Sequence, residues 1–298
     1  MFKNPGFRKV FRAIDTVSKV QQLQPRHTPV VWGNRPGPLD ENELRQFSEA
    51  GFLLLPKLQM KLDRELFNDC VAGCRELRDS PTEGVVRESS TEHVRTVFNA
   101  HGRLECFKRF ASQEFLVSAA KQILDSDIYI HQTHINYKAA FFGEHYFWHQ
   151  DYAFWMNEDG MPSIRALGVG LFVTEMSAVN GPLIVIPGSH RWVVPKQMRS
   201  LGNFSNTAGV KNSDETLSAH GLLTPSELAM MCEHSQPEAI LGPEASVLLF
   251  DPNIAHASPD NLGPTERILA LLFYNSTNNT LKNPSRPEYI ASRDYQPL

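Results

Sequence analysis

The chain has 298 residues, of which 41% are hydrophobic and 21% are charged, a composition typical of globular proteins with a large core. Its formal net charge is −4 and no run of lysine or arginine stands out, so we expect it to bind neither nucleic acid nor an anionic membrane surface. No stretch approaches the roughly 20 apolar residues of a membrane-spanning helix.

The first predicted elements are an N-terminal segment and a capped helix. Residues 1–39 are basic at the start and proline-rich later, and they lack the continuous apolar stretch of a signal peptide, so we expect a peripheral segment. Residues 39–52 read "LDENELRQFSEAGF" and predict a helix. Asp40 can cap its N-terminus, with Glu43 as the reciprocal partner, and Gly51 can end it.

Two further helices are predicted before the middle of the chain, over residues 61–77 ("KLDRELFNDCVAGCREL") and 112–124 ("SQEFLVSAAKQIL"). Cys70 and Cys74 lie on the apolar stripe of the first. The four cysteines show no paired CxxC spacing, so we interpret them as small buried apolar residues rather than ligands or disulfide partners. A reducing, cytoplasmic compartment is therefore expected.

The pattern changes after Ser126, where short apolar segments alternate with Gly, Pro and Asn. Such spacing is typical of an antiparallel barrel or jelly roll. Because helices come first and strands follow, we predict one α+β domain over residues 1–298, with a double-stranded β-helix (jelly-roll, cupin-like) core buttressed by N-terminal and inserted helices. The predicted strands are 128–137, 146–151, 164–173, 182–189, 246–251 and 267–275, preceded by a short buried strand at 52–56.

Two segments depart from the strand pattern. Residues 211–235 include "DETLSAHGLLTPSELAMMCEHS" and predict an inserted helix or a lid that would exclude water from a site. Residues 276–298 are polar and contain proline, so they are predicted to form an extended tail.

Three residues suggest a metal site. His149 and Asp151 are two positions apart, so on a strand both side chains would point to the same face. His256 lies far downstream, just past a strongly apolar strand. Two histidines and one carboxylate form the facial triad that leaves three positions of an octahedral iron(II) open. Those positions can bind a 2-oxo acid and O2, which together oxidise a C–H bond of a substrate.

Arg267 extends this pattern, because it lies eleven residues after His256 and begins the next predicted strand. Its guanidinium can hold the far carboxylate of 2-oxoglutarate through two parallel hydrogen bonds. Taken alone, each residue has an ordinary structural explanation, such as a core histidine or a turn-capping aspartate. The four together, in this order and on predicted strands, favour an iron(II) and 2-oxoglutarate site.

Several motifs resemble the phytanoyl-CoA dioxygenase superfamily, and its ectoine hydroxylase branch in particular. The resemblance spans about residues 30–275 and implies that His149, Asp151 and His256 bind iron and that Arg267 holds 2-oxoglutarate. The motifs that carry it are "HVRTVFNAHG", "IYIHQTHINYK", "FWHQDYAFWMNEDGMPSIRAL", "NGPLIVIPGSHRW" and "HASPDNLGPTER".

The resemblance also implies positions in the pocket. Gln132 and Asn136 fall where the ectoine enzymes place polar residues at the substrate or co-substrate, and Trp155 falls where they keep a pocket tryptophan. His134 and His145 lie near the site in the sequence. We predict Gln132 and His134 at the co-substrate; the predicted substrate contacts are Trp155, Phe154, Asn136, His145 and Ala153.

The predicted substrate is less definite than the chemistry. Ectoine enzymes typically read H-S-D-F-E-T-W-H where this chain has His149 to Met156, so Ala153 and Phe154 replace a Glu-Thr pair. Specificity for a small polar zwitterion depends on paired polar groups. The substrate is therefore predicted to be either ectoine-like or a more apolar, amino-acid-derived or specialised metabolite.

Other reaction outcomes stay open. Related iron halogenases carry Gly or Ala in place of the carboxylate ligand, so Asp151 disfavours halogenation. Hydroxylation is the expected outcome, whereas desaturation, epoxidation and cyclisation use the same iron chemistry. The alternative of another class is a non-catalytic metal-binding β-barrel protein, although structural zinc prefers four protein ligands. A small-molecule substrate is expected as the partner, and a homodimer is allowed.

Overall fold

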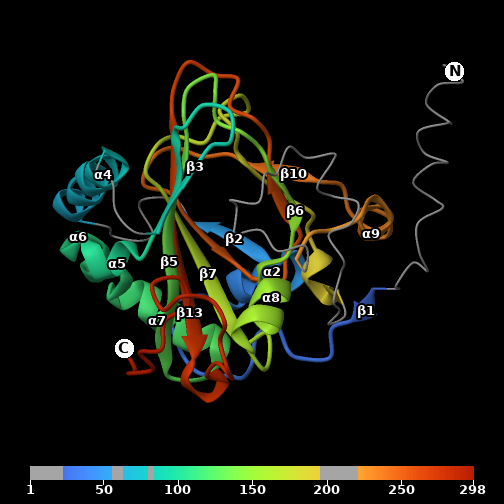
Figure 1. Ribbon diagram of the computed structural model, residues 1–298. Coiled ribbons are helices and arrows are strands. Elements are labelled where there is room, and N and C mark those ends of the chain that lie inside the picture. The colour runs from blue at the N-terminus through green and yellow to red at the C-terminus, as the bar shows by residue number, and fades with distance from the viewer. Residues whose placement is uncertain (1–22, 56–62, 80–83, 195–220) are drawn as a thin grey trace, which may run out of the picture.

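The architecture is that of a computed structural model, which describes residues 23–55, 63–79, 84–194 and 221–298 (Figure 1). Two antiparallel sheets face each other and helices cover the outer side of the larger one, which confirms the predicted α+β double-stranded β-helix. The predictions for residues 1–22 and 211–220 lie outside the described residues, and a single domain over 1–298 stays a prediction. Across the described ranges, no helix is long and apolar enough to cross a membrane.

The larger sheet has seven strands, and every neighbouring pair is antiparallel. The two longest strands, β13 and β5, pair over almost their whole length near its centre. The predicted strands at 128–137, 164–173 and 267–275 are confirmed to within two residues. In sheet order the strands are β2 (Phe52–Leu55), β11 (Val247–Phe250), β7 (Ala166–Phe172), β13 (Arg267–Ser276), β5 (Ile128–Lys138), β4 (Val94–Phe98) and β3 (Val85–Arg87).

The smaller sheet has four short strands. Two of them, β10 and β12, were not predicted, because three residues are too few to show a period-two pattern. A separate pair, β1 (Gln24–Pro25) and β9 (Trp192–Val193), joins the N-terminal segment to the barrel. The strands of the smaller sheet are, in order, β10 (Glu238–Ile240), β8 (Leu183–Val185), β12 (His256–Ser258) and β6 (Tyr146–His149).

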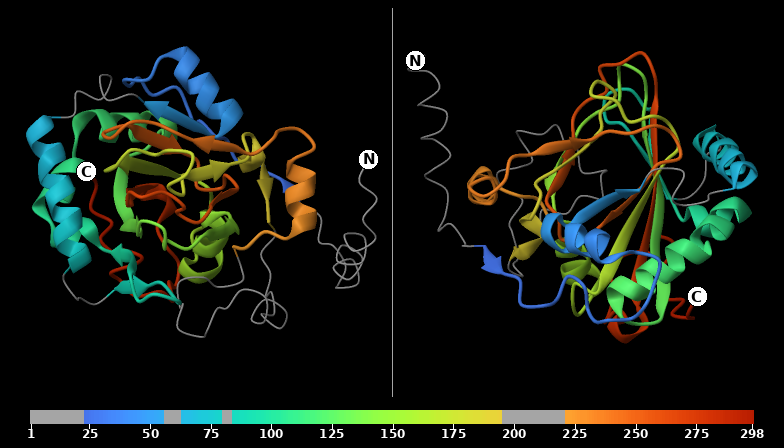
Figure 2. Two further views of the ribbon diagram at one scale, coloured as in Figure 1. Left: turned by 90° about the horizontal axis from the view of Figure 1, so that it is seen from above. Right: turned by 180° about the vertical axis from the view of Figure 1, so that it is seen from behind.

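Most helices lie along the outer face of the larger sheet, as Figure 2 shows from two further sides. The capped helix α2 begins after Asp40, which accepts hydrogen bonds from two backbone N–H groups while Glu43 bonds back to it. Gly51 ends it in the left-handed region with φ 84°, as predicted. The other helices are α4 (Arg64–Asp79), α5 (Ala100–Arg103), α6 (Glu105–Ala111), α7 (Glu114–Leu124), α8 (Asp151–Phe154) and α9 (Pro225–Met231), with α2 over Glu41–Ala50.

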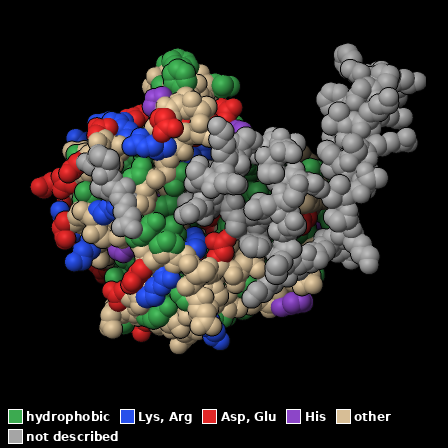
Figure 3. Space-filling model, viewed as in Figure 1, with side chains coloured by type: hydrophobic (Ala, Val, Ile, Leu, Met, Phe, Trp, Pro, Cys, Tyr) green, Lys and Arg blue, Asp and Glu red, His purple; other side chains and the backbone are tan. Residues whose placement is uncertain are grey.

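Alternation along the strands separates two apolar cores. On β13, Ile268 and Leu272 face the helices, whereas Leu269 and Phe273 face the smaller sheet. Cys70 and Cys74 are fully buried and free in the helix-side core, as predicted for small apolar residues. On the outer surface seen in Figure 3, acidic and basic side chains are interspersed. The core between the two sheets surrounds the candidate site.

The C-terminal tail is not simply extended. It forms a 3-10 turn at Thr277–Asn279 and then crosses one end of the barrel without a further helix or strand among the described residues. Backbone hydrogen bonds tie it to the barrel, from Ser285 to the carbonyl of Glu158 at 2.7 Å and from Ser292 to that of His131 at 2.9 Å. The tail thereby brings side chains from the end of the chain to the barrel interior.

A buried ion pair fixes the N-terminal segment to the core. Arg26 Nη1 lies 2.6 Å from Asp251 Oδ2, and both side chains are only 3% exposed. The same guanidinium donates to the backbone carbonyls of Pro29 and Ile164. Since breaking a buried pair leaves an unpaired charge, this contact is expected to matter for stability.

Arg26→Met is expected to lower the free energy of unfolding by about 3–5 kcal/mol, because Asp251 would stay buried without its cation. Urea denaturation of the two proteins measures the difference. The double variant Arg26→Met/Asp251→Asn removes both charges and is expected to recover part of the loss. A single variant within about 1 kcal/mol of the parent would contradict the assignment.

Candidate metal centre

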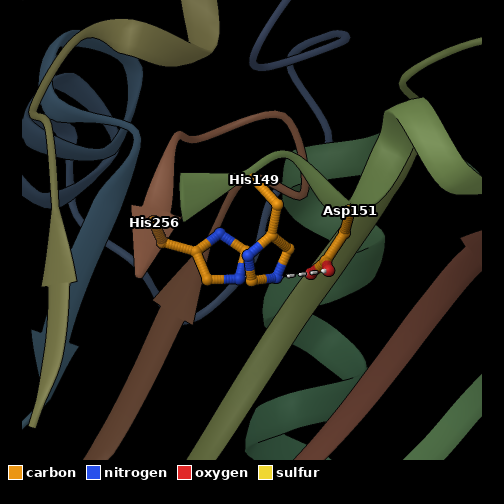
Figure 4. A group of neighbouring side chains, drawn as sticks. All are labelled: His149, Asp151 and His256. Atoms are coloured by element: carbon orange, nitrogen blue, oxygen red, sulfur yellow. Dashed lines mark ion pairs between the residues drawn. The ribbon is translucent and has the colours of Figure 1, made fainter. Parts of the chain in front are cut away.

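Three predicted ligands meet between the two sheets (Figure 4). His149 ends β6 and His256 begins β12, and the two residues stand opposite each other in the strand pairing. One ligand atom from each of His149, Asp151 and His256 lies within 4.8 Å of the others. The Nε2 atoms of His149 and His256 are 3.6 Å and 3.9 Å from the Asp151 carboxylate oxygens.

The backbone reaches this arrangement differently from the prediction. His149 and Asp151 were expected on one strand, but β6 ends at His149 and Asp151 opens the short helix α8. The side chain of Gln150 turns away and donates to the carbonyls of Trp192 (2.8 Å) and Asn253 (2.6 Å). These two hydrogen bonds anchor the chain where it leaves the sheet, so the carboxylate faces the histidines from a helix.

Backbone carbonyls determine which nitrogen of each histidine is available. His149 Nδ1 lies 2.6 Å from the carbonyl oxygen of Phe147, and His256 Nδ1 lies 3.0 Å from that of Ile254. A carbonyl only accepts, so each Nδ1 carries the hydrogen and each Nε2 keeps its lone pair. Both Nε2 atoms face Asp151, as metal ligands would.

Burial also favours the ligating forms. It lowers the pKa of His149 and of His256 to about 4, so both rings are neutral at physiological pH. Burial raises the pKa of Asp151 to about 6, a cost that a bound cation would offset. No fourth His, Cys, Asp or Glu joins the group within the part of the chain that the structure describes. Two neutral imidazoles and one carboxylate suit iron(II) with open positions better than structural zinc.

Arg267 is buried beside this group with an unsatisfied donor. Its side chain comes from the first residue of β13 and is 2% exposed. Nε donates to the carbonyl of Gly181 at 3.1 Å and Nη2 to Ser258 Oγ at 3.0 Å. Nη1 has no hydrogen-bond partner among the described residues. Burial lowers the pKa of Arg267 to about 10, so it stays charged at neutral pH, and no carboxylate of the described residues pairs with it.

A cavity joins Arg267 to the three ligands. Side chains alternate between the two faces of a strand, so every second residue of β5 and β13 forms its walls. Gln132, His134 and Asn136 on β5 line it, as do the residues of β13 that share the face of Arg267. The aromatic residues of its wall include Phe154 and Trp155, which lie in helical turns. Five of the predicted pocket residues line the cavity: Gln132, His134, Asn136, Phe154 and Trp155.

Two predicted substrate residues lie elsewhere. His145 is exposed, with Nδ1 3.1 Å from Asp260 Oδ1. Ala153 is buried but does not belong to the cavity wall. Their contact with a substrate stays a prediction.

Sequence reasoning missed other cavity residues. Leu269, Leu271 and Phe273 follow Arg267 at every second position, so strand periodicity contained the signal for them. Arg286 carried no such signal, because it lies in a polar, irregular tail. Its guanidinium lines the cavity and binds the buried carboxylate of Asp159, 127 positions earlier in the chain.

A jelly-roll barrel that holds two histidines and one carboxylate next to a buried arginine is the design of the iron(II)- and 2-oxoglutarate-dependent dioxygenases, and the protein is an enzyme of this class. Its co-substrates are 2-oxoglutarate and O2. A family model described as Phytanoyl-CoA dioxygenase (PhyH) matches residues 47–269. The chain belongs to the phytanoyl-CoA dioxygenase family.

Similar proteins agree with this membership. The chain is 34% identical to an ectoine dioxygenase of Nocardia farcinica over 286 residues, covering 92% of this chain and 90% of the relative. It is 32% identical to an ectoine dioxygenase of Streptomyces avermitilis, covering 92% and 94%. The crystal structure of EctD from S. alaskensis with 2-oxoglutarate and 5-hydroxyectoine matches at TM-score 0.77 and 28% identity over 92% of both chains.

A more distant likeness concerns the fold alone. The crystal structure of the carbocyclase SnoK from nogalamycin biosynthesis matches at TM-score 0.63 with 14% identity, covering 85% of this chain and 91% of that one. The barrel is therefore shared with an enzyme that has another reaction outcome.

Proposed function

We propose that the protein hydroxylates a C–H bond of an ectoine-like small molecule, with His149, Asp151 and His256 holding iron(II) and Arg267 holding the far carboxylate of 2-oxoglutarate. One observation carries this proposal: the unpaired Nη1 of buried Arg267 lines the same cavity as the three ligand side chains. An arginine in that position requires an anion, and a dicarboxylate that reaches the metal supplies one.

Bound iron would supply the activation of O2, during which 2-oxoglutarate loses CO2 and becomes succinate, so that one oxygen atom enters succinate and the other enters the substrate. The chain's own residues prepare the site for that chemistry. The carbonyls of Phe147 and Ile254 hold the two imidazoles by their Nδ1–H groups, which keeps Nε2 directed inward.

The cavity walls support a small substrate with an apolar part. Phe98, Phe154, Trp155 and Phe273 contribute aromatic surface, which excludes water and orients a C–H bond. Phe154 stands where the ectoine motif has threonine, so this wall offers a ring in place of a hydroxyl. The proposed substrate would set the apolar edge of an ectoine-like ring against Phe154.

The function is tested by substrate-dependent succinate formation. Purified protein with iron(II), 2-oxoglutarate and O2 is expected to form more succinate when ectoine is added, together with a product heavier by one oxygen atom. A product lighter by two hydrogens would indicate desaturation or ring closure instead. If ectoine and a panel of cyclic amino acids and apolar metabolites all left succinate formation unchanged, the proposed hydroxylase function would be wrong.

A further inference from the structure

A row of buried and half-buried polar side chains runs from the C-terminal tail to the cavity wall. Asp159 is fully buried and accepts a hydrogen bond from Arg286 Nε at 2.8 Å and another from Nη2. The same Nη2 donates to Gln132 Oε1 at 3.2 Å. Gln132 Nε2 in turn lies 3.0 Å from His134 Nδ1. Four side chains are therefore joined in one hydrogen-bonded series.

The donor and acceptor groups of these side chains allow only one order of hydrogen bonds along the series. A guanidinium has no acceptor, so Gln132 must present its oxygen to Arg286 and its NH2 group to His134. The NH2 group only donates, so His134 Nδ1 must be the unprotonated acceptor. Burial lowers the pKa of His134 to about 3, which keeps the ring neutral. The single N–H of His134 is then on Nε2.

A β-bulge in β5 places a further side chain next to Asp159, at one end of the series. Phe273 pairs with Gln132 and the next residue, Tyr274, pairs with Ile130, so His131 is the extra residue of β5. The bulge brings His131 within 3.4 Å of Asp159 and places its ring edge-on to Trp155 at 4.8 Å. The buried carboxylate is thus flanked by a ring on one side and by the guanidinium on the other.

The ring of His134 is also fixed by packing. It lies between Phe98 and Phe273, with ring centroids 5.4 Å and 5.7 Å away, and stacks on the latter at 23°. Nε2 has no hydrogen-bond partner among the described residues, and it is not among their fully enclosed unpaired atoms. His134 itself lines the cavity that also holds the three proposed iron ligands.

We propose that His134 determines substrate specificity by donating its Nε2–H to an acceptor on the substrate, a carboxylate or carbonyl oxygen. Asp159, Arg286 and Gln132 are positioning residues that impose this tautomer. His134 was predicted at the co-substrate, but we assign its acceptor to the substrate. The reason is that His134 stacks on Phe273, which packs edge-on against Trp155, a predicted substrate contact, at 4.9 Å, whereas the 2-oxoglutarate carboxylate is assigned to Arg267. This inference rests on the proposed function.

The tautomer is measured directly, without turnover. Full-length protein labelled with 15N-histidine and loaded with diamagnetic zinc(II) is expected to show His134 as the Nε2–H form in long-range 1H–15N spectra, with the signal assigned by its loss in His134→Phe. Gln132→Leu removes the donor to Nδ1 and is expected to mix the two tautomers. An Nδ1–H form or an imidazolium in the parent protein would overturn the inference.

The specificity role is tested by kinetics with ectoine as the probe. His134→Phe keeps the ring packing but lacks the donor, so kcat/KM for ectoine is expected to fall about 10- to 100-fold, while the KM for 2-oxoglutarate stays unchanged. His134→Gln retains a donor of similar reach and is expected to recover most of the loss.

The outcomes distinguish failure of the proposed function from failure of the inference about His134. If neither ectoine nor the panel of cyclic amino acids and apolar metabolites stimulates succinate formation by the parent protein, the proposed function fails and this inference fails with it. If the parent is stimulated and His134→Phe is stimulated equally, only the inference fails. A rise in the KM for 2-oxoglutarate in His134→Phe would also overturn it, since the donor would then serve the co-substrate.

Discussion

Asp151→Ala is expected to lower substrate-dependent succinate formation by at least about 10³-fold. Loss of an outer-shell partner typically costs about 10- to 100-fold in metal affinity or activity, and Asp151 is proposed as a direct ligand. Its carboxylate is the only anionic group of the three. Without it, two neutral imidazoles would neither balance the charge of iron(II) nor hold three of its positions.

Metal content and turnover check this prediction together. The variant is expected to retain little iron after gel filtration, whereas the parent retains it. Asp69→Asn is the matched control, because Asp69 is an exposed carboxylate on α4, 49% exposed and paired with Arg109 at 3.6 Å. It is expected to behave as the parent. Normal turnover by Asp151→Ala would rule out the proposed iron site.

Arg267→Gln is expected to raise the KM for 2-oxoglutarate by roughly 10²- to 10⁴-fold, because removing one partner of a buried ion pair costs about 3–5 kcal/mol. Gln is neutral and cannot offer a fork of two parallel N–H groups to a carboxylate. Iron content is expected to be unchanged, since Arg267 is not among the three proposed ligands. The effect therefore separates co-substrate binding from metal binding.

The measurement is succinate formation over a range of 2-oxoglutarate concentrations, with the other substrate saturating. Arg109→Gln provides the control, because Arg109 is the exposed partner of Asp69 on the outer helices. A KM within a factor of about two of the parent's would show that another residue holds the 2-oxoglutarate carboxylate. It would leave the iron assignment intact.

Local patterns in the sequence predicted the parts of this protein that short-range physics controls. The capping box of α2 depends on Asp40 and Glu43, three residues apart, and it formed as expected. The resemblance to the ectoine enzymes implied that Gln132 and Asn136 lie at the pocket, and period-two alternation along β5 puts both on one wall of the cavity. These features depend on hydrogen bonds and side-chain directions within one segment.

Tertiary structure alone decided the rest, because those contacts join segments that have no local relation. Asp151 reaches the histidines from a helix, since Gln150 is anchored to carbonyls 42 and 103 positions away. Arg286 reaches the cavity because the tail folds back onto the barrel, where Arg286 binds Asp159. The bulge at His131 brings that ring within 3.4 Å of the same carboxylate. The residue types for iron and 2-oxoglutarate were visible in the sequence; the series that orients His134 exists only where sheet packing brings these distant segments together.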